Sequence, residues 1–226
     1  MLFPKDVLIV IPARNGSQRV RNKNLVKIKN KHLIEYTYSL IKNLKVEKQT
    51  YVTTDSIKII DLAKKYNINF IKRPKNISTS VSKIELALIH LLEKEKLIKL
   101  YDWILLLQPT SPLRKSKTIE NLIDIFKKRK KNIDSIISFS ESKEDFWKKK
   151  NNFYLRDNDF TPRRQQDRKS KFYENGLFYL FKIDNLLKKK RIFNKKNIGV
   201  LTDKLESIDI NNNDDLRLVK KIIYSK

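Results

Sequence analysis

The chain has 226 residues, of which 40% are hydrophobic, and this size and composition suit one globular domain with a full-sized core. Its apolar runs, such as residues 7–11, are too short to cross a bilayer, and the N-terminus lacks the layout of a signal peptide. We therefore expect a cytoplasmic protein that does not contact membranes. The absence of cysteine excludes disulfides, thiolate zinc sites and cysteine nucleophiles.

The charge is strongly basic, because 51 lysines and arginines face 25 acidic residues and give a net charge of +26. Such an excess raises the possibility of nucleic acid as a partner. The lysines, however, are spread along the whole chain in short clusters, which favours solvated basic faces. We therefore do not expect nucleic acid as a partner, although a positive field would also attract small anionic molecules.

Strands and helices alternate in the predicted pattern of the first 139 residues. Strands are predicted at residues 6–11, 49–53, 68–71, 103–107 and 135–139, and helices at 33–43, 57–66, 82–96 and 117–130. This alternation predicts a single-domain α/β fold of the Rossmann-like kind, in which a mostly parallel sheet is flanked by helices.

A polar insertion follows the fifth strand and interrupts this rhythm. Residues 140–171 are rich in charge, with Phe146, Trp147, Phe153 and Tyr154 scattered among them, as is common in a lid, an arm or a hairpin. Two further strands at 177–181 and 205–210 and a helix at 214–224 complete the prediction. With no linker visible, residues 1–226 are predicted to form one domain.

The loop after the first strand is the first candidate site. It holds Gly16 and Ser17 together with cations that include Arg14 and Lys23. Ligands of open α/β sheets bind at the carboxyl ends of strands, where such a loop suits a triphosphate. A solvated basic loop explains the same composition, and the residues alone leave both interpretations open.

Two later strand ends carry the other candidates. Gln108 lies between a buried strand and the rigid Pro109, where its amide could bind a hydroxylated ligand. Asp209 ends the last predicted strand, where a carboxylate can hold Mg²⁺ beside phosphates. The alternative is a cluster of Asp and Asn residues that caps the following helix.

Several ordered motifs of the chain are similar to those of the acylneuraminate cytidylyltransferases. These motifs are IPAR, GS and KN within residues 11–24, VTTD at 52–55, RP at 73–74, LLQPTSPLR at 106–114, NGLFY at 175–179 and SIDI at 207–210. The resemblance covers almost the whole chain. It implies a nucleotide-diphospho-sugar transferase-like fold and a homodimer in which residues 140–171 form an arm that reaches the partner's site.

The resemblance also implies roles for individual residues. The CTP phosphates would be bound by Arg14 and Lys23, the nucleotide would be held by Gly16, Ser17, Asn24 and Arg73, and the sugar would be bound by Gln108, Arg164 and Asn175. Asp209 would bind Mg²⁺. The family usually continues SIDI with a second aspartate, whereas this chain has Asn211.

The implied reaction joins CMP from CTP to an acidic nonulosonic sugar, either a sialic acid or a related bacterial sugar, and releases pyrophosphate. Alternatives are a cytidylyltransferase for the eight-carbon sugar Kdo or another sugar, and a catalytically weakened or basic nucleic-acid-binding relative. LLQPTSPLR argues against the Kdo branch, which resembles a QGDEP pattern instead. No residue is assigned as the general base.

Overall fold

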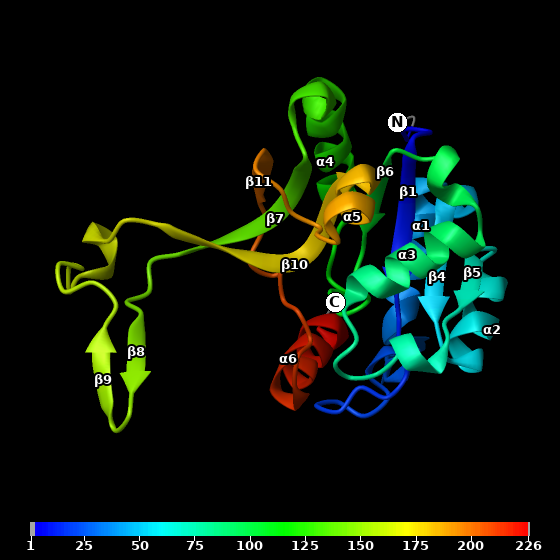
Figure 1. Cartoon of the computed structure of the whole chain (residues 1–226). Coiled ribbons are helices and arrows are strands. Elements are labelled where there is room, and N and C mark those ends of the chain that lie inside the picture. The colour runs from blue at the N-terminus through cyan, green and yellow to red at the C-terminus, as the bar shows by residue number, and fades with distance from the viewer. Residues whose placement is uncertain (1–2, 226) are drawn as a thin grey trace.

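The computed structural model describes residues 3–225 and confirms the predicted α/β architecture (Figure 1). A seven-stranded sheet runs in the order β11-β7-β10-β6-β1-β4-β5. Its strands are β1 (Val7–Pro12), β4 (Thr50–Thr54), β5 (Asn69–Lys72), β6 (Trp103–Leu106), β7 (Ser135–Ser142), β10 (Lys171–Lys182) and β11 (Asn197–Leu201). The helices are α1 (Leu33–Leu44), α2 (Ile57–Lys65), α3 (Ile84–Lys94), α4 (Ser116–Arg129), α5 (Ile183–Lys189) and α6 (Asn213–Tyr224).

The sheet is parallel except at β10, which runs antiparallel to both of its neighbours, β6 and β7. The pairs β1–β4, β1–β6, β4–β5 and β7–β11 are all parallel. The carboxyl ends of β1, β4, β5 and β6 therefore meet at one edge of the sheet, which is where a ligand site is expected in this architecture.

The core explains why β1 is a central strand. Its residues alternate between two apolar clusters, because successive side chains of a strand point to opposite faces. Ile9 packs with residues of α1, α2 and α4, whereas Leu8 packs with residues of α3 and α5. Both side chains are completely buried, as expected for a parallel strand with helices on each face.

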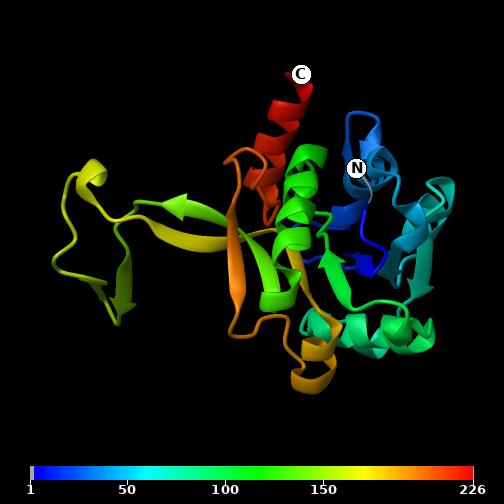
Figure 2. The same ribbon diagram turned by 90° about the horizontal axis from the view of Figure 1, so that it is seen from above.

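The predicted insertion forms an arm that projects from the sheet (Figures 1 and 2). Its stem is the outer part of β7 and β10, which pair as far as Ser142 and Lys171. Its tip carries an antiparallel pair, β8 (Trp147–Lys150) and β9 (Phe153–Arg156). A second small pair, β2 (Lys27–Ile28) with β3 (Lys31–His32), lies before α1.

The prediction of a strand at residues 205–210 is wrong, since this segment has no regular structure. Its apolar side chains are satisfied elsewhere: Ile210 is buried in a separate cluster with residues of α6, and Ile208 packs against that cluster. The edge strand is instead β11, which the sequence prediction missed together with α5. Among residues 3–225 the structure contains no helix whose length and apolar content would allow it to span a membrane.

Candidate active site

The loop after β1 is fixed by contacts to segments that are distant in the sequence. The backbone N–H of Ala13 donates to the carbonyl of Thr53 at 3.0 Å, and the Asn24 side chain donates to the carbonyl of Arg14 at 3.1 Å. Gly16 adopts a φ of 72°, which is unfavourable for residues with a Cβ. Lys23 donates to the carbonyl of Ile210 at 2.5 Å and so ties the loop to the 207–210 segment.

This loop and the end of β6 enclose a pocket of about 290 Å³, which we call the nucleotide-loop pocket. Its lining comprises Pro12, Arg14, Ser17, Gln18, Arg19, Lys23, Asn24, Ser80, Gln108, Pro109 and Thr110. Three of these side chains are cationic, and none of the described residues that line it carries a carboxylate. The structure thus brings together Arg14, Ser17, Lys23, Asn24 and Gln108, with Gly16 beside them, in a site suited to a polyanion.

Burial changes the acid–base properties of two cations at this edge of the sheet. It lowers the pKa of Lys23, while the nearby Asp209 carboxylate opposes that effect. It also lowers the pKa of Arg73 to about 10, and there Asp55 opposes the effect. The Arg73 guanidinium donates to the Thr53 hydroxyl at 3.2 Å and to the Thr53 carbonyl at 2.8 Å. Arg73 therefore remains cationic at neutral pH.

A second pocket of about 350 Å³, the strand-end pocket, shares Pro12, Arg14 and Gln108 with the first. Its remaining lining residues are Arg73, Ser82, Ile84, Leu106, Glu174, Tyr179, Ile192 and Phe193. The rings of Tyr179 and Phe193 lie 5.7 Å apart between centroids. The two pockets therefore adjoin at Arg14 and Gln108, and the second is partly aromatic.

A distortion in β10 forms one wall of the strand-end pocket. The register with β7 shifts between Glu174 and Tyr179, and Gly176 has a φ of 76° within this turn. A Cβ at Gly176 would lie 3.8 Å from both Gln108 Nε2 and Tyr179 Oη, so these polar groups converge on the turn. Burial raises the pKa of Tyr179, and Glu174 raises it further, so the phenol stays protonated. Sequence reasoning missed Glu174, Tyr179 and Phe193, because no local pattern reveals this register shift.

The side-chain amide of Asn175 is occupied by hydrogen bonds within the protein. Its side-chain nitrogen donates to the hydroxyls of Ser140 at 2.9 Å and Thr202 at 2.8 Å, and its oxygen accepts from the Leu177 N–H at 3.2 Å. The side chain is buried and lies outside the lining of both pockets. Asn175 therefore stabilises the turn in β10 and has no side-chain hydrogen left to donate to a substrate.

Asp209 interacts electrostatically with Lys23 but lines a different pocket, of about 680 Å³, together with Ser207 and Ile208. Its Oδ2 accepts from the Asn211 side chain at 2.8 Å, whereas its Oδ1 is buried without a hydrogen-bond partner. The predicted capping role belongs to Asn212 and Asp215 at the start of α6, where Asn212 accepts from the N–H of Asp214 at 2.8 Å and of Asp215 at 3.0 Å. Asp209 is therefore free of the cap, and its orphaned oxygen is chemically suited to a cation.

Arg164 belongs to the arm and lines neither of the two pockets. It precedes a short helical turn, Gln165–Asp167. Its side chain is 72% exposed and lies 3.8 Å from Asp167.

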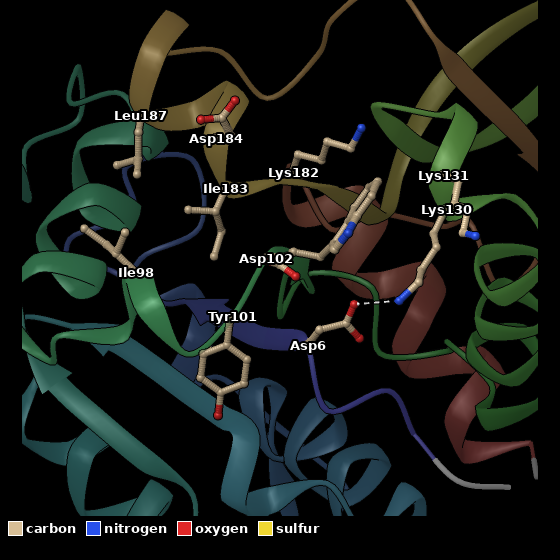
Figure 3. A pocket seen from close by; sticks show the side chains of 11 residues that line it. Asp6, Ile98, Tyr101, Asp102, Lys130, Lys131, Lys182, Ile183, Asp184 and Leu187 are labelled. Atoms are coloured by element: carbon tan, nitrogen blue, oxygen red, sulfur yellow. Dashed lines mark hydrogen bonds and ion pairs between the residues drawn. The ribbon is translucent and has the colours of Figure 1, made fainter.

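A larger pocket of about 520 Å³ lies at the opposite edge of the sheet, where β1 and β6 begin (Figure 3). Its charged side chains are largely paired: Lys130 lies 3.1 Å from Asp6, and Lys182 lies 3.7 Å from Asp134. The Lys182 ammonium also lies 5.4 Å from the centre of the Trp103 ring. None of the predicted site residues lines this pocket, which lies between neighbouring strands and helices.

Comparison with known proteins relates the chain to enzymes of nucleotide-sugar synthesis. The chain is 30% identical to CMP-N,N'-diacetyllegionaminic acid synthase of Legionella pneumophila over 96% of each sequence. It is 26% identical to the pseudaminic acid cytidylyltransferase and UDP-2,4-diacetamido-2,4,6-trideoxy-beta-L-altropyranose hydrolase of Helicobacter pylori. That alignment covers 90% of this chain but 40% of the relative, so the chain spans less than half of that protein.

The fold is shared with solved structures at low sequence identity. The structure of CMP:2-keto-3-deoxy-manno-octonic acid synthetase complexed with CTP superposes with a TM-score of 0.69 at 15% identity, covering 97% of this chain and 98% of that one. The model of the family described as "Cytidylyltransferase" matches residues 8–223, which include every strand end that lines the two pockets. The chain belongs to this cytidylyltransferase family.

Proposed function

We propose that the protein transfers CMP from CTP to the anomeric hydroxyl of an acidic nonulosonic sugar, a sialic acid or a related bacterial sugar, and releases pyrophosphate. The observation that carries this proposal is that the two pockets meet at Arg14 and Gln108. A cationic pocket for the triphosphate therefore adjoins a chamber for the acceptor. The relatives that match most of this chain include an N-acylneuraminate cytidylyltransferase and a CMP-N,N'-diacetyllegionaminic acid synthase.

Binding and orientation account for most of the proposed mechanism. Arg14 and Lys23 would neutralise the phosphates and stabilise the charge that develops on the leaving pyrophosphate. Gln108 would hydrogen-bond the sugar at the boundary of the two pockets and align its hydroxyl with the α-phosphorus. Arg73, anchored on Thr53, would hold the nucleotide from the far side of Arg14.

Asp209 is the residue that would hold Mg²⁺. Its buried Oδ1 lacks a partner, and a carboxylate oxygen is the kind of ligand that this ion prefers. Among residues 3–225 no group of three or more acidic or histidine side chains surrounds a possible metal position. One carboxylate would therefore anchor the ion, with nucleotide oxygens and water as the other ligands. When bound, Mg²⁺ would supply additional charge neutralisation at the phosphates.

We further propose that the protein is a homodimer assembled through the arm. The arm exposes large apolar side chains that a monomer leaves in water, including Phe153 at 73% and Phe160 at 93% exposure. An isolated two-stranded ribbon such as β8–β9 is marginally stable on its own, so packing against a second copy would stabilise it. That arrangement would carry Arg164 to the sugar pocket of the partner, where its guanidinium could bind the carboxylate of the acceptor.

The test is pyrophosphate release with each of four nucleoside triphosphates and a panel of acidic sugars that includes Kdo. We expect CTP with a nonulosonic acid to support turnover well above every other pair. Equal use of all four nucleotides would exclude the cytidylyl assignment, and a preference for Kdo would move the acceptor to the eight-carbon class.

A further inference from the structure

We propose that Arg114 is a positioning residue of this reaction, which holds the Gln108 and Gly176 wall of the strand-end pocket from behind. The inference rests on the proposed function and adds a residue that lines neither pocket. Arg114 is 7% exposed and lies at the start of the segment that leads into α4. It therefore acts on a substrate only through the residues that it holds.

The contacts of Arg114 join the two strands that form this wall. Its Nε donates to the carbonyl of Leu177 at 2.8 Å, and its Nη2 donates to the carbonyl of Gln108 at 2.8 Å. The first acceptor belongs to the turn in β10, and the second follows the end of β6. One planar guanidinium thus fixes both backbones with two directional hydrogen bonds.

These hydrogen bonds begin where the ladder between β6 and β10 ends. The last paired residues are Leu106 and Tyr179, and continuation of the same antiparallel register would place Gln108 opposite Leu177. The turn at Gly176 and the proline after Gln108 end the regular ladder there. Arg114 therefore bonds both carbonyls of the pair that the ladder leaves open.

This arrangement determines where the Gln108 amide lies. The backbone of Gln108 is held by Arg114, and its Nε2 lies next to the Gly176 turn, 3.8 Å from a Cβ built at that glycine. The turn is held by the same guanidinium through Leu177. Loss of Arg114 would release the Gln108 amide and the Gly176 turn together, although both of these residues are unchanged.

The charge of Arg114 supports a positional role over a purely stabilising one. Burial lowers its pKa to about 10, while Asp209 and Glu206 attract the cation and oppose that effect. No carboxylate of the described residues forms an ion pair with it, and its Nη1 is buried without a partner. A buried cation without a direct counter-ion is unfavourable, and an apolar side chain would avoid that cost. What an apolar side chain cannot supply is the pair of bonds to Leu177 and Gln108.

The experiment is a double-mutant cycle with Arg114→Lys and Gln108→Ala, measured with CTP and the best acidic sugar of the panel. Lysine keeps the charge but cannot make both bonds in the same geometry. We expect Arg114→Lys to lower kcat/KM for the sugar by about 10-fold to 10²-fold, as loss of alignment does. CTP binding, measured by calorimetry, should change by less than about 3-fold, because the nucleotide-loop cations are untouched.

The cycle separates positioning from simple destabilisation. In the Gln108→Ala background, Arg114→Lys should add less than about a 3-fold further loss, because the residue that it positions is already gone. A loss that persists in full in that background, or wild-type kinetics of Arg114→Lys, overturns the proposal. Ile119→Val, a buried change in α4 away from both pockets, is the matched control and should lower Tm without altering use of the sugar.

A measurement on the unchanged chain covers the case in which Arg114→Lys does not fold. The Arg114 Nε–H should exchange slowly with water and shift in nitrogen-15 NMR spectra when CTP and sugar bind, and an unshifted signal contradicts the proposal. The measurement on the wild-type protein distinguishes the role of Arg114 from the proposed function. Absence of turnover with every acidic sugar refutes the proposed function, whereas normal turnover with an additive cycle refutes the role of Arg114 alone.

Discussion

Lys23 is the half-buried cation of the nucleotide-loop pocket, and burial lowers its pKa below the usual 10.5. Lys23→Ala should reduce kcat/KM by about 10²-fold, as loss of a charge contact to a leaving group does. The KM for CTP should rise at alkaline pH as Lys23 loses its proton. Because the pKa of Lys23 is lowered, this rise should begin at a lower pH than it would with a lysine of ordinary pKa. Lys23→Arg should remove that rise, since arginine stays charged. A KM profile that is the same in wild type and Lys23→Arg would contradict this role.

Although CTP binding should weaken over this alkaline range, the stability of the fold should increase over it. The folded state, with its lowered pKa, binds fewer protons at Lys23 than the unfolded state between the folded pKa and 10.5. The free energy of unfolding contributed by this group therefore increases as the pH rises through that window. A pH series of chemical unfolding with wild type and Lys23→Arg would measure the difference.

Asn211 determines the surroundings of the proposed metal ligand, since its amide donates to Asp209 Oδ2 at 2.8 Å. Asn211→Asp would place a second carboxylate there, so Tm should fall without Mg²⁺ and rise more steeply with added Mg²⁺ than in wild type. The Mg²⁺ concentration needed for half-maximal pyrophosphate release should also decrease. Asp209→Asn should nearly abolish turnover. Normal metal dependence in that variant would mean that the ion is held elsewhere.

At the scale of the elements, the arm can be removed at a defined point. Ser142 and Lys171 are paired at its base, so an Asn-Gly turn in place of residues 143–170 would close the hairpin. We expect a monomer that retains CTP binding but uses the sugar poorly, because the arm of the partner is missing. Light scattering and calorimetry would measure both properties. A shortened chain that remains dimeric and active would exclude the arm as the interface.

The strands and helices that the sequence predicts correctly are those with strong hydrophobic periodicity. The first five predicted strands and the helices between them match β1, β4, β5, β6 and β7 and helices α1 to α4 within a few residues. The Ile-Asp-Ile alternation at 208–210 failed because a coil that buries Ile210 against α6 satisfies the same pattern. The short β11 was missed because its residues are mostly exposed, as befits an edge strand.

Sequence patterns also predict the part of the candidate site that lies in contiguous motifs. Arg14, Lys23, Asn24 and Gln108 lie in contiguous motifs at strand ends, and their meeting follows from parallel strand order. The wall formed by Glu174, Tyr179 and Phe193 depends on a register shift and on a segment after α5. The partners of the Asn175 amide, Ser140 and Thr202, could not be predicted, because they come from distant parts of the sequence.

For the whole molecule, the net charge of +26 should be visible in binding of the anionic substrates. Raising the salt concentration should increase the KM for CTP and leave kcat nearly unchanged, because screening weakens long-range attraction more than contacts in the pocket. Filter binding to DNA should show at most weak affinity that disappears near physiological salt. Tight DNA binding under those conditions would favour the nucleic-acid alternative.

The antiparallel course of β10 allows the arm to change in length without a change in the rest of the sheet. Because β10 returns beside β7, the arm leaves and re-enters the sheet at one pair of opposite residues, Ser142 and Lys171. Insertions and deletions between them leave the register of the other strands unaltered. The length and exposed apolar residues of the arm, and with them the proposed dimer interface, can thus change while the residues that line the two pockets remain in place.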